Sequence, residues 1–247
     1  MKEIMENYIA TGFNEIYWKR WGVSWIASLR EFAEYKGDIL VVNFGLSIST
    51  RKKLAELGVT ILPGGYEANF RVGILNAISE FAEKHSGIFA VWDADVYFQD
   101  NIDEIFDLAK DQLVITDNVG FYAGTSKDLA SFKEIQNLIS FIQQENHFAH
   151  EYLPYFPQAR KIGNTWNFTE VTKLQDDGKF TFNNEIQKVI HPAGPIKDFL
   201  PGRKIAFWER HKDVFKKYSD GNYYTSNRRL VSKNDCTSEN IDIQSIE

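Results

Sequence analysis

The chain has 247 residues, 43% of them hydrophobic and 25% charged, which is the composition of a folded globular protein. This length is sufficient for one large domain around a single core. The 34 acidic residues outnumber the 28 basic ones and give a net charge of -6, which disfavours a general nucleic-acid binder because such proteins need excess positive charge. The single cysteine, Cys236, excludes an intrachain disulfide and a zinc site built from cysteines.

The beginning of the chain predicts no secretory leader. Residues Met1 to Phe13 include Glu3 and Glu6 and lack the apolar core of a signal peptide. No later apolar run approaches the ~18 residues that a membrane-spanning helix needs. Together with the lone cysteine, these features predict a protein of the reducing cytoplasm.

The first half of the chain alternates strand-like apolar runs with helical patterns. Strands are expected at Tyr8 to Thr11, Asp38 to Phe44, Val59 to Leu62 and Ile88 to Trp92. Helices are expected around Trp25 to Ala33, from Ser47 or Ser49 to a stop at Gly58, and from Phe70 to Phe81. This alternation predicts an α/β fold with a mainly parallel sheet and helices on both faces. Ligands of such sheets bind beyond the carboxyl ends of the strands.

The second half is less regular. Strands are expected at Leu113 to Thr116 and around Phe121, and a long amphipathic helix from Ser126 to Gln144. Residues Glu145 to Phe199 are rich in aromatic residues, proline, glycine and asparagine, which is typical of ordered loops that carry function. One more helix is expected within Phe207 to Tyr218. We therefore predict one domain over residues 1–218 and a polar tail over residues 219–247.

The sharpest local motif is Asp93-Ala94-Asp95, where the apolar run Ile88 to Trp92 ends. Two carboxylates one residue apart at a strand end are able to hold a divalent cation. Such a triplet is expected about once by chance in this composition, so the motif match alone is weak. The alternative is that both aspartates only cap the turn toward Asn101 to Asp107. The position at the end of a central strand favours the metal hypothesis.

A second motif lies about 100 residues further on, directly after the apolar pair Val189-Ile190, which we expect to be a strand that neighbours the one ending at Trp92. His191 is suited to be a third metal ligand, Gly194 permits close approach of the backbone, and Lys197 is suited to bind phosphate. The alternative is an ordinary histidine that makes hydrogen bonds in a loop.

The order and spacing of three elements resemble the GT-A fold glycosyltransferases, and most closely the retaining family 8 of galactosyl- and glucosyltransferases and glycogenin. These elements are Asp93-Ala94-Asp95, Trp166-Asn167-Phe168 and the set His191, Gly194 and Lys197. The resemblance spans Tyr8 to Phe199. It implies a Rossmann-like GT-A sheet, an irregular C-terminal region on the acceptor side, and Mn²⁺ or Mg²⁺ held by Asp93, Asp95 and His191.

The resemblance also implies a nucleotide-sugar site. Ala10, Thr11 and Asn14 correspond to the family's nucleotide loop, although Gly12 replaces the aspartate that usually meets uracil. Ala94, Gly194 and Lys197 would lie at the donor as well, with Lys197 on the diphosphate. Arg71 corresponds to an arginine that faces the donor sugar and diphosphate, with an exposed helical arginine as the alternative.

Two further positions depart from the family pattern. Tyr122 in the run Gly120 to Gly124 stands where the family has asparagine. Glu145-Asn146 stands at the family's Asp-Gln pair, about 20 residues before Trp166-Asn167. The resemblance implies that Asn146 steadies the developing cation and that Glu145 orients it; the alternative is the polar end of a helix. Retention would proceed through a covalent intermediate or by attack on the face of the departing diphosphate.

The function expected from these residues is transfer of a hexose from a nucleotide-diphosphate sugar, such as UDP-glucose or UDP-galactose, to a glycan or lipid-linked acceptor, as in polysaccharide biosynthesis. A sugar nucleotidyltransferase is one alternative, although the first loop has only two widely spaced glycines. A carbohydrate-binding protein without catalysis is the other. Trp166, Phe168 and Tyr152 are candidate faces for an acceptor sugar, or core residues.

Residues 210–233 are the one basic region that stands out. They carry seven basic residues against Asp213 and Asp220, interleaved with aromatic residues. This pattern predicts peripheral contact with the inner face of an anionic membrane, with a solvated polar tail as the alternative. The sequence predicts no oligomeric state.

Overall fold

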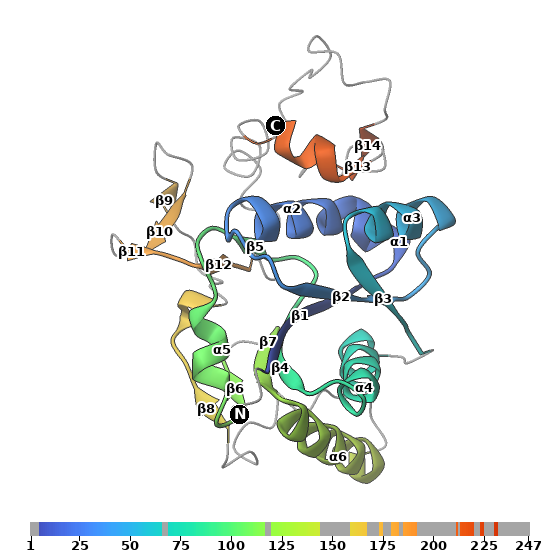
Figure 1. The fold of residues 1–247 in the computed structure, drawn as a ribbon, viewed down its shortest axis with the longest axis vertical. Helices are drawn as coiled ribbons and strands as arrows, with labels where there is room; N and C mark the ends of the chain where they lie inside the picture. The colour runs from blue at the N-terminus through green and yellow to red at the C-terminus, as the bar shows by residue number, and fades with distance from the viewer. Residues whose placement is uncertain are drawn as a thin grey trace.

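The computed structural model describes residues 5–65, 69–116, 120–143, 159–166, 173–174, 179–182, 185–191, 211, 213–219, 223–224 and 230–231. A seven-stranded sheet lies at its centre, in the order β3-β2-β1-β4-β7-β6-β8 (Figure 1). The strands are β1 (Glu6–Phe13), β2 (Asp38–Asn43), β3 (Val59–Pro63), β4 (Gly87–Trp92), β6 (Val114–Ile115), β7 (Phe121–Thr125) and β8 (Arg160–Lys161).

The sheet is mostly parallel, which confirms the predicted α/β fold. Strand β1 pairs in parallel with β2 and β4, and β2 pairs in parallel with β3. Strand β7 runs antiparallel to both β4 and β6, while β6 and β8 are parallel. The short connection from Ile115 to Phe121 explains the change of direction, because a parallel crossover needs a dozen or more residues.

Helices cover both faces of the sheet (Figure 1). One face packs against α2 (Val23–Glu31), α3 (Ile48–Glu56) and α5 (Glu104–Ala109), and the other against α4 (Phe70–Ala82) and α6 (Ser126–Gln143). The short helix α1 (Glu15–Tyr17) has no buried residue, and a π-helical stretch, η1 (Trp18–Gly22), joins it to α2. Neighbouring residues of β1 point to opposite cores: Ile9 lies in the cluster with Trp25, and Ala10 in the cluster with Leu75.

The ends of α3 lie where the sequence predicts them. The side chain of Ser47 accepts a hydrogen bond from the backbone N–H of Thr50 and caps the start of the helix. Gly58 follows the C-cap with φ of 71°, a left-handed conformation that glycine adopts without steric cost.

Short elements complete the fold. Strand β5 (Tyr97–Phe98) pairs with β12 (Val189–Ile190), and β10 (Phe180–Phe182) pairs with β9 (Lys173–Leu174) and β11 (Glu185–Ile186). A 3-10 turn, η3, covers Asn164–Trp166. The described residues between 211 and 218 are helical, as predicted, and Phe215 is buried. The predicted tail contains a strand pair, β13 (Tyr223–Tyr224) with β14 (Leu230–Val231).

The described helices include none that combines the length and the apolar character needed to cross a membrane.

Candidate metal centre

Asp93 and Asp95 lie just beyond β4, the middle strand of the sheet. Every residue of β4 is buried, which explains its continuous apolar sequence. The backbone N–H of Asp93 donates to the carbonyl of Gly120 at 2.8 Å, and the indole Nε1 of Trp25 donates to the carbonyl of Asp93 at 3.1 Å. The backbone of Asp93 is therefore fixed by Gly120, just before β7, and by α2.

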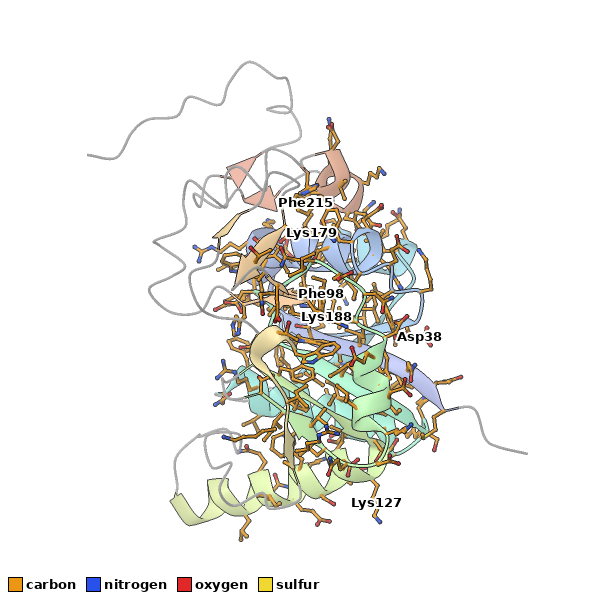
Figure 2. All side chains as sticks on the ribbon, turned by 90° about the vertical axis from the view of Figure 1, so that its left-hand side faces the viewer. Asp38, Phe98, Lys127, Lys179, Lys188 and Phe215 are labelled. Atoms are coloured by element: carbon orange, nitrogen blue, oxygen red, sulfur yellow. The ribbon has the colours of Figure 1, made fainter. Side chains whose placement is uncertain are left out.

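His191 reaches the two aspartates through a strand pair outside the main sheet. Val189 pairs with Phe98 and Ile190 with Tyr97, so β12 returns the chain to the segment that follows Asp95. Figure 2 labels Phe98 and Lys188, which lie on these neighbouring segments. We expected His191 at the end of a strand, and this is confirmed. The expectation that this strand neighbours β4 is wrong, because β12 pairs with β5.

The three side chains form a compact cluster of two carboxylates and one imidazole. The Nε2 atom of His191 lies 3.2 Å from Oδ1 of Asp95 and 3.7 Å from Oδ2 of Asp93. One ligand atom from each of the three residues lies within 4.8 Å of the others. His191 is 3% exposed and Asp95 5%. Burial of such polar groups costs free energy unless a partner, such as a bound cation, pairs with them.

This donor set fits a divalent cation. Carboxylate oxygens suit Mn²⁺, Mg²⁺ and Ca²⁺, whereas an imidazole nitrogen favours Mn²⁺ over Mg²⁺. The Nδ1 atom of His191 is buried without a hydrogen-bond partner among the described residues, and Nε2 faces the carboxylates. The structure thus brings together the three residues that the sequence predicts as metal ligands.

Gly120 makes room for this cluster. Its φ is 137°, and a Cβ atom at this position would lie 2.7 Å from Oδ2 of Asp93 and 2.8 Å from Cε1 of His191. A side chain would therefore be strained and would displace two of the candidate ligands. This role of Gly120 was not predicted from the sequence, although a glycine directly before a predicted strand was a usable signal.

Arg71 lies on the opposite side of Asp93 from Trp25. Its guanidinium donates from Nη2 to Oδ2 of Asp93 at 2.7 Å and from Nε to Oδ1 at 3.3 Å. The side chain of Arg71 is 34% exposed and that of Asp93 is 16% exposed. Arg71 thus lies at the predicted site and pairs there with a metal ligand; its role at the donor sugar stays a prediction.

A small pocket lies beside the cluster. Its lining combines one cation, one carboxylate, one phenol and apolar groups, namely Arg71, Ile74, Val91, Trp92, Asp93, Gly120 and Tyr122. Burial, and to a smaller extent the charge of Asp93, raise the pKa of the Tyr122 phenol well above its ordinary value. Tyr122 therefore contributes a neutral wall near the carboxylate.

The predicted nucleotide-loop residues lie along β1 and just after it. Ala10 and Thr11 are fully buried in the sheet. The side chain of Asn14 caps α1 and accepts a hydrogen bond from the N–H of Tyr17 at 2.8 Å. A Cβ atom at Gly12 would lie 2.7 Å from side-chain atoms of both Phe44 and Ile74. These two side chains therefore occupy the space that a larger side chain at position 12 would need. The contact of these positions with a nucleotide stays a prediction.

Trp166 is a core residue, which is one of the two alternatives that the sequence left open, and it does not offer a face to an acceptor sugar. It is 4% exposed, and the Nζ atom of Lys188 lies 4.6 Å from the centre of its ring. The indole of Trp92, the last residue of β4, donates to the carbonyl of Trp166 at 2.8 Å. Trp166 therefore contacts the last residue of β4, the strand that Asp93 follows.

Several predicted site residues lie outside the described part of the chain. They are Glu145, Asn146, Tyr152, Asn167, Phe168, Gly194 and Lys197. Most of the basic residues between 210 and 233, as well as Cys236, also lie outside it.

The fold resembles that of several solved glycosyltransferase structures. The glycosyltransferase GlyE of Streptococcus pneumoniae TIGR4 matches in its apo form with a TM-score of 0.59 at 12% identity, over 87% of this chain and 63% of that chain. A second structure of GlyE gives 0.59 at 13% identity, over the same shares. The bifunctional glycosyltransferase WbbM, in its apo structure, gives 0.55 at 13% identity, over 88% of this chain and 52% of that chain.

The chain thus spans less than two thirds of the length of these structures. No protein-family model and no curated protein matches the sequence. The likeness to the solved structures is therefore one of fold, and the candidate metal ligands lie at the carboxyl end of its central strand.

Proposed function

We propose that the chain is a metal-dependent glycosyltransferase of the GT-A class, similar to the retaining family 8. It would transfer a hexose from a nucleotide-diphosphate sugar, with UDP-glucose and UDP-galactose as the first candidates, to a glycan or lipid-linked acceptor. The observation that carries the proposal is the meeting of Asp93, Asp95 and His191 beside an open pocket, at the end of the central strand of a glycosyltransferase fold.

The three residues suit the demands of this reaction. Glycosyl transfer leaves a diphosphate with growing negative charge, and a divalent ion bound to this diphosphate stabilises that charge. Asp93 and Asp95 would hold the ion through oxygen, and His191 through Nε2. Burial of Asp95 and His191 excludes water from one side of the site, which strengthens the electrostatic interactions there.

Other residues are assigned by resemblance and belong to the proposal. Lys197 would place a second positive charge on the departing diphosphate, with Gly194 allowing close approach. Asn146 would steady the cationic sugar, and Glu145 would orient it. Ala10, Thr11, Asn14 and Ala94 would contact the donor.

The test is a panel of nucleotide sugars, incubated with Mn²⁺ and assayed for release of the nucleoside diphosphate. Release from at least one donor, abolished by a chelator, is expected, and the responsive donor identifies the base and the sugar. NMR of the transferred sugar is expected to show retention of the donor's anomeric configuration. An inverted product would remove the chain from the family 8 mechanism.

Two parallel assays, one with nucleoside triphosphates and sugar phosphates and one with carbohydrates alone, separate the rival functions. Consumption of a nucleoside triphosphate and a sugar phosphate, with release of pyrophosphate, would identify a nucleotidyltransferase instead. Binding of carbohydrate without any release of nucleoside diphosphate would identify a binding protein.

A further inference from the structure

Arg71 occupies the carboxylate that the proposed metal site needs. It engages both oxygens of Asp93, and the shorter contact, 2.7 Å, goes to Oδ2. Oδ2 is also the Asp93 oxygen that lies 3.7 Å from Nε2 of His191. The atom best placed to share a cation with the imidazole is therefore already bound to a guanidinium.

The position of Arg71 is built into the fold. The residue lies in the first turn of α4, where the side chain of Asn69 accepts a hydrogen bond from the N–H of Arg71 at 2.9 Å. Helix α4 packs against the sheet through Leu75 and Ile78, which are fully buried. The packing of α4 on the sheet thus places the guanidinium of Arg71 beside the end of β4.

Two consequences follow from this pair. The charge of Arg71 repels a second cation at Asp93, because like charges a few ångströms apart in a partly buried site are only weakly screened. Arg71 also lines the pocket beside the cluster. An anion in that pocket would offer the guanidinium a second partner, and planar guanidinium groups bind phosphate oxygens in the same two-pronged way as carboxylates.

We propose that Arg71 is a positioning residue that couples metal binding to diphosphate binding. Without an anion in the pocket, Arg71 remains on Asp93 and weakens the binding of a divalent cation. With a diphosphate present, Arg71 shares its charge with the phosphate oxygens and leaves Oδ2 of Asp93 to the metal. Coupling of this kind is reciprocal, so the metal strengthens diphosphate binding by the same factor. The inference rests on the proposed function, which supplies both the cation and the diphosphate.

The experiment measures the affinity for Mn²⁺ alone by electron paramagnetic resonance, which reports the free ion. Arg71→Gln, which removes the charge, is expected to bind Mn²⁺ at least about fivefold more tightly than the unmodified chain. Arg71→Met should agree with it, and Arg71→Lys, which keeps the charge, should remain close to the unmodified chain. Arg51→Gln, on the exposed side of α3, controls for the change in net charge.

A second measurement tests the coupling. UDP, with GDP and ADP as further probes, is titrated by calorimetry with and without Mn²⁺, after correction for the metal that each nucleotide binds in solution. The gain in nucleotide affinity from Mn²⁺ is expected to fall by about fivefold or more in Arg71→Gln. Circular dichroism establishes that each variant is folded.

The outcomes separate the two proposals. If the unmodified chain binds Mn²⁺ but Arg71→Gln and Arg71→Met bind it equally well or less tightly, the coupling role of Arg71 is overturned and the metal centre stands. If neither the unmodified chain nor the Arg71 variants bind Mn²⁺ more tightly than Asp95→Ala, the metal centre itself is overturned, and this inference with it.

Discussion

Asp93 is held from both faces of the sheet before any ligand arrives. The indole of Trp25, in α2, donates a hydrogen bond to the carbonyl of Asp93, and the guanidinium of Arg71, in α4, pairs with its carboxylate. The carbonyl of Gly120 accepts a hydrogen bond from the backbone N–H of Asp93. The two backbone contacts, from Trp25 and Gly120, fix the position of Asp93 before a ligand binds, so less order must be created on binding. At the scale of single residues, the backbone of the site is therefore preorganised, whereas the Asp93 carboxylate is paired with Arg71 and becomes available to a metal only when that pair loosens.

Gly120 provides the first prediction. Gly120→Ala is expected to destabilise the protein by about 1–3 kcal/mol, because alanine is strained at a φ of 137° and its Cβ would collide with Asp93 and His191. The affinity for Mn²⁺ should fall as well, since two of the ligands are displaced. Urea denaturation and metal titration measure the two effects.

The matched control for this change is Gly163→Ala. A Cβ atom at Gly163 meets nothing within 4 Å, and its φ lies outside the left-handed region. We expect this control to keep its metal affinity. A Gly120→Ala variant with unchanged stability and unchanged metal binding would contradict the assigned role.

Lys197 provides the second prediction, which follows from the proposed function. A charge that acts on the leaving diphosphate matters more in the transition state than in the bound ground state. Lys197→Ala is therefore expected to lower kcat by about 100-fold or more, with a much smaller change in donor affinity. Steady-state kinetics and equilibrium binding of the donor separate these terms. A loss of affinity with kcat intact would show that Lys197 only binds.

At the scale of elements, long periodic segments were predictable and short ones were not. The strand that ends at Trp92 and the helix from Phe70 were predicted because each has enough residues to display a period. Strands β5 and β12 have two residues each and carry no period of their own. Their pairing, which brings His191 to Asp95, depends on tertiary contacts.

The candidate site was predictable in its residue types but not in its supports. Asp93, Asp95 and His191 stood out because polar ligands directly follow apolar runs. The contact of Trp25 with Asp93 spans 68 positions of sequence, and nothing in a tryptophan of an apolar helix face indicates such a partner. For Trp166 the sequence left an acceptor face and a core position as alternatives, because its contacts with Trp92 and Lys188 come from distant parts of the chain.

Glu15 provides a prediction about how elements are joined. Its carboxylate, in α1, accepts hydrogen bonds from the N–H of Ser47 at 2.8 Å and from the hydroxyl of Thr50 at 3.0 Å, at the start of α3. Burial acts to raise the pKa of Glu15, but these hydrogen bonds together with Lys19 outweigh it and lower the pKa below its usual 4.5.

A lowered pKa in the folded state stabilises the protein above the ordinary pKa, and this stability is lost as the pH falls through the folded value. Glu15→Gln is therefore expected to reduce the free energy of unfolding by about 1 kcal/mol at pH 7. The difference from the unmodified chain should shrink as the pH falls below 4.5. Denaturation at several pH values measures this, with the exposed Glu80→Gln as control. A difference independent of pH would refute the role of the charge.

At the scale of the whole molecule, two helical layers enclose the main sheet (Figure 1). Asp93 and Asp95 follow its central strand, and His191 joins them from the end of β12. GlyE and WbbM share this fold at 12–13% identity, and both are longer than this chain. We propose residues 1–218 as the catalytic domain and residues 219–247 as a polar extension. Acceptor choice is expected to depend on the irregular region that follows α6, because loops vary freely on a common scaffold.

The basic segment 210–233 provides a prediction for the molecule as a whole. If it contacts an anionic membrane beside a lipid-linked acceptor, the protein should co-sediment with phosphatidylserine vesicles at low salt and dissociate at high salt. Neutral phosphatidylcholine vesicles serve as the control. Equal recovery in the supernatant with both kinds of vesicle would remove the membrane proposal and leave the enzymatic one intact.

The most direct test of the central claim compares the unmodified chain with Asp95→Ala in the release of nucleoside diphosphate from its best nucleotide-sugar donor, across a titration of Mn²⁺. Asp95 is 5% exposed and lies 3.2 Å from His191, so its carboxylate is expected to be a metal ligand. We predict release that rises with Mn²⁺ in the unmodified chain and is abolished in a folded Asp95→Ala variant. Release with an unchanged dependence on Mn²⁺ in that variant would contradict the account.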